Sequence, residues 1–294
     1  MSHSLNLIRK QAVGAHLRRA VRILVYVLVG LQWKTPTAPI APVYQTDIGQ
    51  HTAITLKDRS EVHLGGATSI VVNDTSELST IHLQRGEIFT EARHNAERPF
   101  EVVANHLIAF DLGTAYDMST HDSTSSIAVI DGQVRLFERN DWGQRFDPIT
   151  VEFGVYQRVP VILGPGDSAR TEQLDNGTII VTRGPTNLAI ARQSTEWLRD
   201  GMIANTRRLD DIVWQFNRYN LTPIVIDHPE VGVNPLGMVA FRLGDINGFI
   251  DALRLEYDVE FVASVGDQPA SYHVRGKRSA PERFARSRGR GRGK

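Results

Sequence analysis

The chain has 294 residues, of which 41% are hydrophobic and 22% are charged, which excludes wholesale disorder, collagen-like repeats and a polytopic membrane protein. It contains no cysteine, which excludes disulfides, cysteine-ligated zinc, iron–sulfur clusters and thiol catalysis. The formal net charge of zero hides two basic ends: residues 1–22 carry +5 and residues 275–294 carry +8, which leaves −13 for the body. An acidic body of this kind does not fit a nucleic-acid binder, and we expect no nucleic-acid partner.

An uncharged run from Ile23 to Trp33 lies between Arg22 and Lys34. It is shorter than the roughly 20 residues of an average membrane-spanning helix, but basic side chains at both ends can snorkel to a thin bilayer's surface. We therefore expect a membrane anchor at residues 23–33, preceded by a short basic cytoplasmic segment, residues 1–22, that lies on inner-membrane lipid. A cleaved signal peptide and a cytosolic core helix are the alternatives, and only the last keeps the body in the cytoplasm.

Residues 34–43 contain three prolines and predict an extended stalk. From residue 44 to residue 165, short alternating apolar runs are broken by turn residues, a pattern typical of an all-β domain. The runs expected to form strands are 53–56, 61–64, 69–72, 80–83, 87–90, 100–103, 107–111, 126–130, 133–137 and 150–155. Residues 166–196 are expected to be a linker with short strands.

From Trp197 onward the apolar spacing changes to three and four residues, which predicts helices near 209–219 and 245–255. With short strands between and around these helices, residues 197–263 are expected to form a β-α-β-β-α-β domain. The Arg- and Gly-rich tail, residues 264–294, is expected to be disordered. The predicted fold class is therefore mainly β, with a smaller α+β domain and one N-terminal transmembrane helix.

Seven short motifs resemble, in the same order, those of the FecR family of periplasmic and inner-membrane sigma-factor regulators. The motifs are Tyr44-Gln-Thr-Asp-Ile-Gly49, Leu56-Lys-Asp58-Arg-Ser60-Glu-Val62-His-Leu64, Leu83-Gln-Arg-Gly86-Glu87-Ile-Phe89, Arg98-Pro99-Phe100-Glu-Val102, Asp111-Leu112-Gly113-Thr114-Ala-Tyr116, Trp197-Leu-Arg-Asp-Gly201 and Phe216-Asn217-Arg218-Tyr219. Each motif alone is weak, but their shared order over about three-quarters of the chain makes the resemblance strong.

The resemblance implies a single-pass inner-membrane protein with a cytoplasmic N-terminus and a periplasmic body. Such a protein relays a signal from a TonB-dependent outer-membrane receptor to an extracytoplasmic-function sigma factor, usually in iron–siderophore uptake. The family's cytoplasmic anti-sigma domain is longer than residues 1–22, so we expect it to be shortened or missing here, unless the true start lies upstream. An exported β-rich binding or scaffold module without sigma-factor control is the alternative.

The resemblance also implies that the C-terminal domain docks the signalling domain of the receptor. The residues assigned to receptor binding are Trp197, Trp214, Phe216, Arg218 and Tyr219. Trp214 and Phe216 are two residues apart in the expected helix, about 200° around its axis, so both cannot face one core. One of the two, together with Arg218, is therefore expected on an exposed partner-binding face.

Some family members cut themselves between a glycine and a threonine, and Gly113-Thr114 resembles that site. The threonine hydroxyl would attack the preceding carbonyl, with Asp111 or Tyr116 as the nearest candidate bases. A turn glycine beside a strand threonine is the alternative interpretation. We expect no other enzymatic activity.

The remaining polar residues favour no metal site and no cofactor. The regularly spaced histidines form no zinc-type pair, and the isolated carboxylates lie where turns and strand ends place polar caps. The histidines are His51, His63, His82, His94 and His106, and the carboxylates are Asp47, Asp58, Glu87 and Asp111.

Overall fold

The computed structural model describes residues 41–93, 95, 98–111, 113–140, 143–152, 155–174, 176–204, 207–237, 239–263 and 269–277. The expected cytoplasmic segment, the anchor at residues 23–33 and residues 34–40 of the stalk lie outside this set, as do residues 278–294 of the tail. Among the described residues, no helix is both long enough and apolar enough to cross a bilayer.

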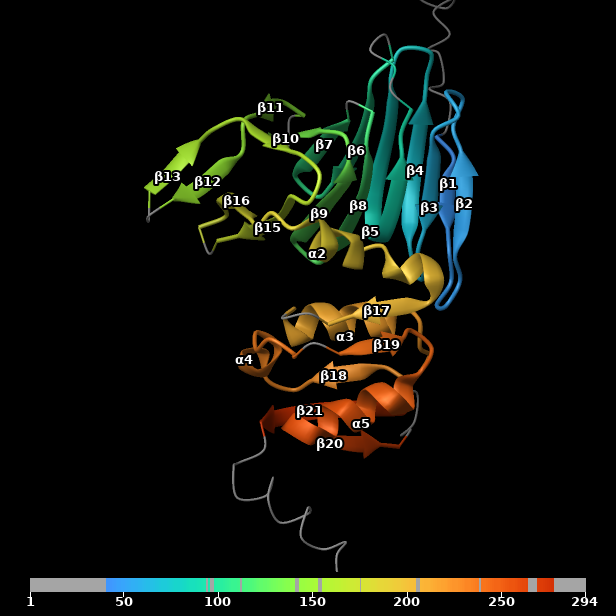
Figure 1. Ribbon diagram of the computed structural model, residues 1–294, viewed down its shortest axis with the longest axis vertical. Helices are drawn as coiled ribbons and strands as arrows, with labels where there is room; N and C mark the ends of the chain where they lie inside the picture. Colours follow the sequence, from blue (N-terminus) through green and yellow to red (C-terminus); the bar gives the residue numbers. More distant parts are fainter. Residues whose placement is uncertain are drawn as a thin grey trace, which may run out of the picture. The chain divides into compact units, whose positions relative to one another are not determined.

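The first part of the described body is a β structure whose sixteen strands are joined by hydrogen bonds, so the expectation of a mainly β fold is confirmed (Figure 1). The strands are β1 (Val43–Gln45), β2 (Thr52–Thr55), β3 (Glu61–Leu64), β4 (Ser69–Asp74), β5 (Ser79–Glu91), β6 (Phe100–Ala104), β7 (Leu107–Asp111), β8 (Ala115–His121), β9 (Thr124–Asp131), β10 (Val134–Arg139), β11 (Arg145–Phe146), β12 (Ile149–Glu152), β13 (Val155–Arg158), β14 (Val161–Leu163), β15 (Ser168–Gln173) and β16 (Ile179–Arg183).

The long strand β5 belongs to two layers. Its first half pairs with β4 and β6, and its second half, from Gly86 onward, pairs with β3 and β8. Gly86 has a φ of +94°, and a Cβ there would lie 2.4 Å from Thr68 Oγ1, so both the conformation and the close approach require glycine. Buried side chains on both halves, among them Ile81 and Ile88, fill the core of this β structure.

Residues 166–196 contain the expected short strands, but these strands belong to the sheet and the segment does not act as a linker. These residues add β15 and β16 to the sheet and form helix α2 (Leu188–Gln193), which begins at the side-chain cap of Asn187. The physical reason is that Ala169 and Val181 are buried in the core of the β structure. The segment is therefore part of the β structure.

The C-terminal part contains two small sheets and two amphipathic helices. Its elements are the 3₁₀ turn η1 (Glu196–Arg199), β17 (Gly201–Ile203), α3 (Leu209–Asn217), β18 (Ile224–Ile226), α4 (Pro229–Gly232), β19 (Ala240–Arg242), α5 (Ile246–Glu256), β20 (Tyr257–Val262) and β21 (Ser271–Lys277). Helices α3 and α5 lie where the apolar spacing predicts them, and their Phe216 and Phe249 rings stack 4.0 Å apart in a second core.

The expectation of a disordered tail is wrong for residues 271–277. Strand β21 lies between β18 and β20, parallel to the first and antiparallel to the second. Tyr272 and Val274 are two residues apart, as the apolar side chains on one face of a strand are, but the basic residues around them make the segment resemble a polar tail. Val274 is fully buried in the second core. The central strand of this sheet thus comes from sequence that resembles a polar tail.

The burial of Val274 gives a stability prediction with a matched control on the neighbouring strand. Val274→Ala should lower the free energy of unfolding by about 2 kcal/mol, because it removes two buried methyl groups and leaves a cavity. Val225→Ala, at a position that is 38% exposed, should change it by less than about 0.5 kcal/mol. Urea denaturation measures both, and equal effects would contradict the central position of β21.

Candidate functional site

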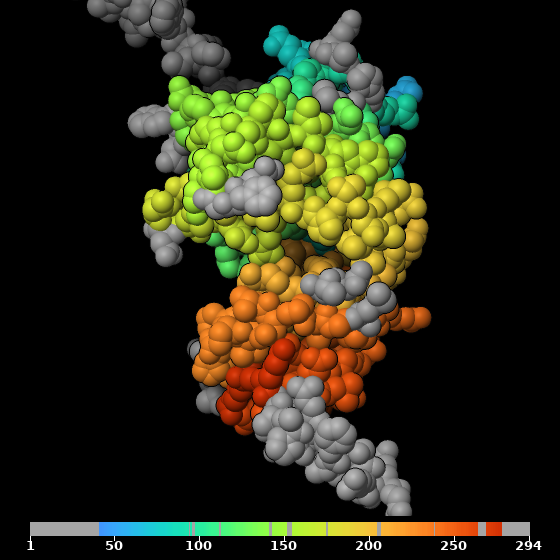
Figure 2. Space-filling model, turned by 60° about the vertical axis from the view of Figure 1, so that its left-hand side comes forward, coloured from blue at the N-terminus to red at the C-terminus, as the bar shows by residue number. Residues whose placement is uncertain are grey.

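The C-terminal part packs on the outer face of strands β5 and β8. Phe89 of β5 belongs to the second core, and Ala115 and Ile130 pack against that core from the β structure. In the space-filling view, the green and yellow residues adjoin the orange residues of the C-terminal part (Figure 2). Two acidic residues, Glu87 and Asp117, are buried on this strand face, each with 4% exposure.

Arg218 forms a buried ion pair with Glu87 across the junction between the C-terminal part and the β structure. The arginine caps the C-terminus of α3, and its Nη1 donates to Glu87 Oε2 at 2.8 Å. Its Nε donates to the carbonyl of Gly66 at 2.8 Å, and its Nη2 donates to Thr68 Oγ1 at 3.2 Å. A buried ion pair stabilises a structure only when its remaining polar atoms are also satisfied, and all three nitrogens of the guanidinium donate to an oxygen here.

The turn at Gly65 and Gly66 allows the C-terminal part to approach this closely. A Cβ on Gly66 would lie 2.4 Å from the Arg218 carbonyl oxygen, and one on Gly65 would lie 2.6 Å from its Nη2. The backbone N–H of Gly66 donates to the Tyr219 hydroxyl at 3.2 Å, and that of Gly49 donates to the Arg218 carbonyl at 2.9 Å. Main-chain contacts thus reinforce the ion pair.

Trp197 and Asp117 form a second buried contact. The indole Nε1 of Trp197 donates to Asp117 Oδ2 at 2.8 Å, and the tryptophan is fully buried. Burial raises the pKa of Asp117 well above its ordinary value, and the negative charge of Glu87 raises it further. The hydrogen bond from Trp197 and the charges of Arg218 and Arg207 oppose this rise only in part.

The five residues assigned to receptor binding lie at this junction or in the core beside it. Trp197, Phe216 and Arg218 are buried, so the expectation that Arg218 is exposed is wrong. Trp214 and Tyr219 are partly buried, and the Arg218 guanidinium lies 4.7 Å and 5.7 Å from their ring centres. The reason is that α3 is covered on two sides, by α5 and by the β structure, so opposite faces of the helix are both enclosed.

From the sequence, Glu87 is expected to be a polar cap at a strand end, and Asp117 is not among the expected site residues. A signal for Glu87 is present, since a lone acidic residue precedes the apolar pair Ile88-Phe89 inside a strand. The sequence signal for Asp117 is weaker, because this residue alternates with the buried Tyr116 and Met118 as any solvent-facing strand residue would. Neither residue's partner, 131 and 80 residues away in the chain, is visible from local patterns.

The Gly113-Thr114 step is a turn that leads into β8. Gly113 has a φ of +90°, and its N–H donates to the Asp111 carboxylate. The Thr114 side chain is buried and its hydroxyl donates to the Gln133 carbonyl at 2.8 Å. These contacts give both residues a structural role, while self-cleavage stays a prediction.

The described residues bring one group of possible metal ligands together. Ligand atoms of Glu61, His63 and Glu91 lie within 4.8 Å of one another, with both glutamates exposed to solvent. Exposed acidic groups often gather without an ion, and we assign no metal site to them. His94 lies outside the described residues.

The Glu87–Arg218 pair predicts a strongly non-additive response to mutation. Arg218→Met should lower the free energy of unfolding by about 3–5 kcal/mol, because Glu87 is left buried without a partner. In the double variant Arg218→Met/Glu87→Gln the loss should be smaller than the sum of the single losses by about 1–3 kcal/mol. Urea denaturation of wild type, Arg218→Met, Glu87→Gln and the double variant measures this coupling energy. Losses that simply add would mean that the ion pair is solvated.

The pKa of Asp117 predicts how stability changes with pH. Between its ordinary pKa of about 4 and its raised pKa, the folded chain holds a proton that the unfolded chain has released, so stability falls as pH rises through this window. Asp117→Asn removes the titration and keeps an oxygen for Trp197. We expect wild type to lose stability relative to this variant as pH increases, measured by urea denaturation. Parallel pH profiles would contradict the raised pKa.

Comparison with known proteins covers both parts of the described body. Residues 42–135 match the family model of the FecR protein. Two crystal structures of a proposed anti-sigma factor from Parabacteroides distasonis ATCC 8503 match with a TM-score of 0.60 and 16% identity, over 79% of this chain and 98% of theirs. This likeness shows a shared fold, and no curated protein sequence matches the chain. The resemblance to the FecR family is confirmed over residues 42–135, which match the model of that family.

Proposed function

We propose that the protein is a membrane-anchored sigma-factor regulator of the FecR type. Residues 23–33 anchor it in the inner membrane, residues 1–22 lie in the cytoplasm, and the FecR domain and the C-terminal part lie in the periplasm. It relays a signal from the signalling domain of a TonB-dependent receptor to an extracytoplasmic-function sigma factor, with iron–siderophore uptake as the usual context. The FecR match and the fold shared with a proposed anti-sigma factor support this function.

The proposal depends mainly on one observation, which is that residues from several family-like motifs lie together at the junction. Glu87 comes from a motif inside the FecR domain, whereas Trp197 and Arg218 come from motifs outside it, and all three lie at one buried junction. A receptor that moves or loads the C-terminal part acts directly on this ion pair. The buried motif residues therefore act in the relay, and receptor contact falls to exposed surfaces of the C-terminal part.

Self-cleavage between Gly113 and Thr114 belongs to the same proposal as a processing step. The Thr114 hydroxyl adds to the Gly113 carbonyl, the peptide C–N bond breaks to leave an ester and a free amine, and water then hydrolyses the ester. The hydrogen bond from Thr114 to Gln133 must break first, because it holds the hydroxyl proton.

A transcription experiment tests the relay. In a strain that lacks the protein, transcripts dependent on extracytoplasmic-function sigma factors should change, and the wild-type chain and Val225→Ala should restore them. Arg218→Met should reach the membrane, as an immunoblot of the tagged chain shows, yet fail to restore the response to the receptor's ligand. The same blot reports whether the chain is cut near residue 113.

One outcome would favour the other function considered. If deletion changes no sigma-dependent transcript, and the purified body captures no receptor signalling domain of the host, the relay is contradicted. The protein would then be an exported β-rich binding or scaffold module.

A further inference from the structure

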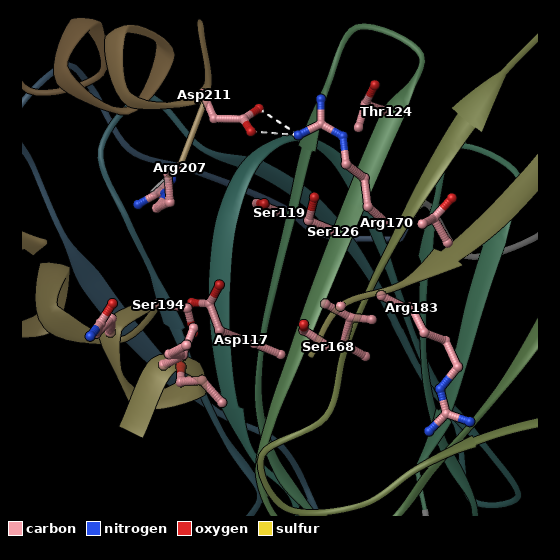
Figure 3. Close-up of a pocket in the computed structure, with 18 of the residues that line it drawn as sticks. Asp117, Ser119, Thr124, Ser126, Ser168, Arg170, Arg183, Ser194, Arg207 and Asp211 are labelled. Carbon is pink, nitrogen blue, oxygen red and sulfur yellow. Dashed lines mark hydrogen bonds and ion pairs between the residues drawn. The ribbon is translucent and has the colours of Figure 1, made fainter. Parts of the chain in front are cut away.

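A cavity of about 400 Å³ lies beside the junction, between the outer face of the β structure and the C-terminal part. Strands β8, β9 and β15 form its floor, and α2 and the start of α3 contribute to its walls (Figure 3). The volume is in the range of small-molecule binding sites. Two carboxyl groups that are at least nine-tenths buried, those of Glu87 and Asp117, line it.

Small hydroxyl side chains lie on the floor of the cavity beside apolar ones. Ser119 of β8 pairs with Ser126 of β9, which pairs in turn with Arg170 of β15, so these side chains share one face of the sheet. Ser168 lies on the same face, one pleat along β15, and Figure 3 shows all four around the cavity. A sheet face covered by other elements normally buries apolar residues, and each hydroxyl here can both donate and accept a hydrogen bond.

Two of the three arginines that line the cavity form ion pairs within the chain, and the third donates to a neutral amide. Arg170 donates to both oxygens of Asp211, with the shorter contact at 2.6 Å. Arg183 contacts Asp167 at 3.1 Å, and Arg207 donates to Gln215 at 2.8 Å. The Nη1 of Arg170 and the Nη2 of Arg183 are therefore occupied by carboxylates of the chain itself.

The cavity also has apolar surface. Ala128 on the floor and Ile190 and Ala191 of α2 line it beside the hydroxyl groups. Hydroxyl groups, committed ion pairs and small apolar side chains in one cavity match a ligand that carries many hydroxyl groups, no charge and a C–H face.

We infer that this cavity is a binding site for a small neutral saccharide. The serines and Asp117 hydrogen-bond the sugar hydroxyls, and Ala128 and Ile190 contact the ring's C–H face. The inference is independent of sigma-factor control, since it depends only on the cavity.

Isothermal titration calorimetry of the purified full chain tests the inference. The probes are glucose, galactose, N-acetylglucosamine, maltose, cellobiose and lactose, with glucuronate and glucosamine as charged comparisons. We expect at least one neutral sugar to bind at millimolar concentration or below, and more tightly than both charged sugars. Ser126→Leu, which fills the floor, should weaken that binding by at least about tenfold, whereas Ser76→Leu, in an exposed turn outside the cavity, should leave it unchanged.

Thermal melting shows whether Ser126→Leu folds, and Ser119→Leu serves in its place if it does not. The inference is overturned if no neutral sugar of the set binds at millimolar concentration. Tighter binding of glucuronate, or binding that survives both leucine variants, would overturn it as well. A chain that binds sugar and controls no sigma factor would support this inference while contradicting the proposed relay.

Discussion

The buried ion pair between Arg218 and Glu87 is the constraint on which the arrangement of the described body depends. Both charges are removed from water at a cost of several kcal/mol each, and only close pairing with further hydrogen bonds offsets that cost. The Gly66 carbonyl and the Thr68 hydroxyl supply those bonds to the arginine. A shift of the C-terminal part by a few ångströms would leave both charges buried and unpaired, so the junction favours two states, formed or broken, over intermediate positions.

Several family-like motifs have a physical explanation at this junction. Gly86 lets β5 pass between layers and sets the position of Glu87, while Gly66 lets the Arg218 backbone approach the turn. Trp197 fills the interior and donates to Asp117, so its indole contributes both apolar area and a hydrogen bond. These residues serve the contact between two parts of the chain, which explains why they are spread over more than 130 positions.

The sequence predicts the local elements better than the site. Apolar spacing locates α3 and α5, and alternation locates most of the early strands. Strand β8 is not among the expected strands because its outer residues Asp117, Ser119 and His121 are polar, and β21 is hidden by the basic residues around Val274. For the site, Trp197 and Arg218 are singled out, but their burial depends on contacts with Asp117 and Glu87 that no local pattern reveals.

The junction and the cavity share the carboxyl groups of Glu87 and Asp117, and this places both proposals in one thermodynamic cycle. A ligand that binds only while the C-terminal part is docked stabilises the docked state by RT ln(1 + [L]/Kd), about 2.7 kcal/mol at a hundredfold excess over Kd. By reciprocity, any partner that undocks this part must weaken ligand binding by the same factor. Because Arg218 Nη1 donates to Glu87 Oε2, a broken ion pair leaves the carboxylate of Glu87 at the cavity wall without this partner. The state of the junction therefore determines which chemistry the cavity can accept.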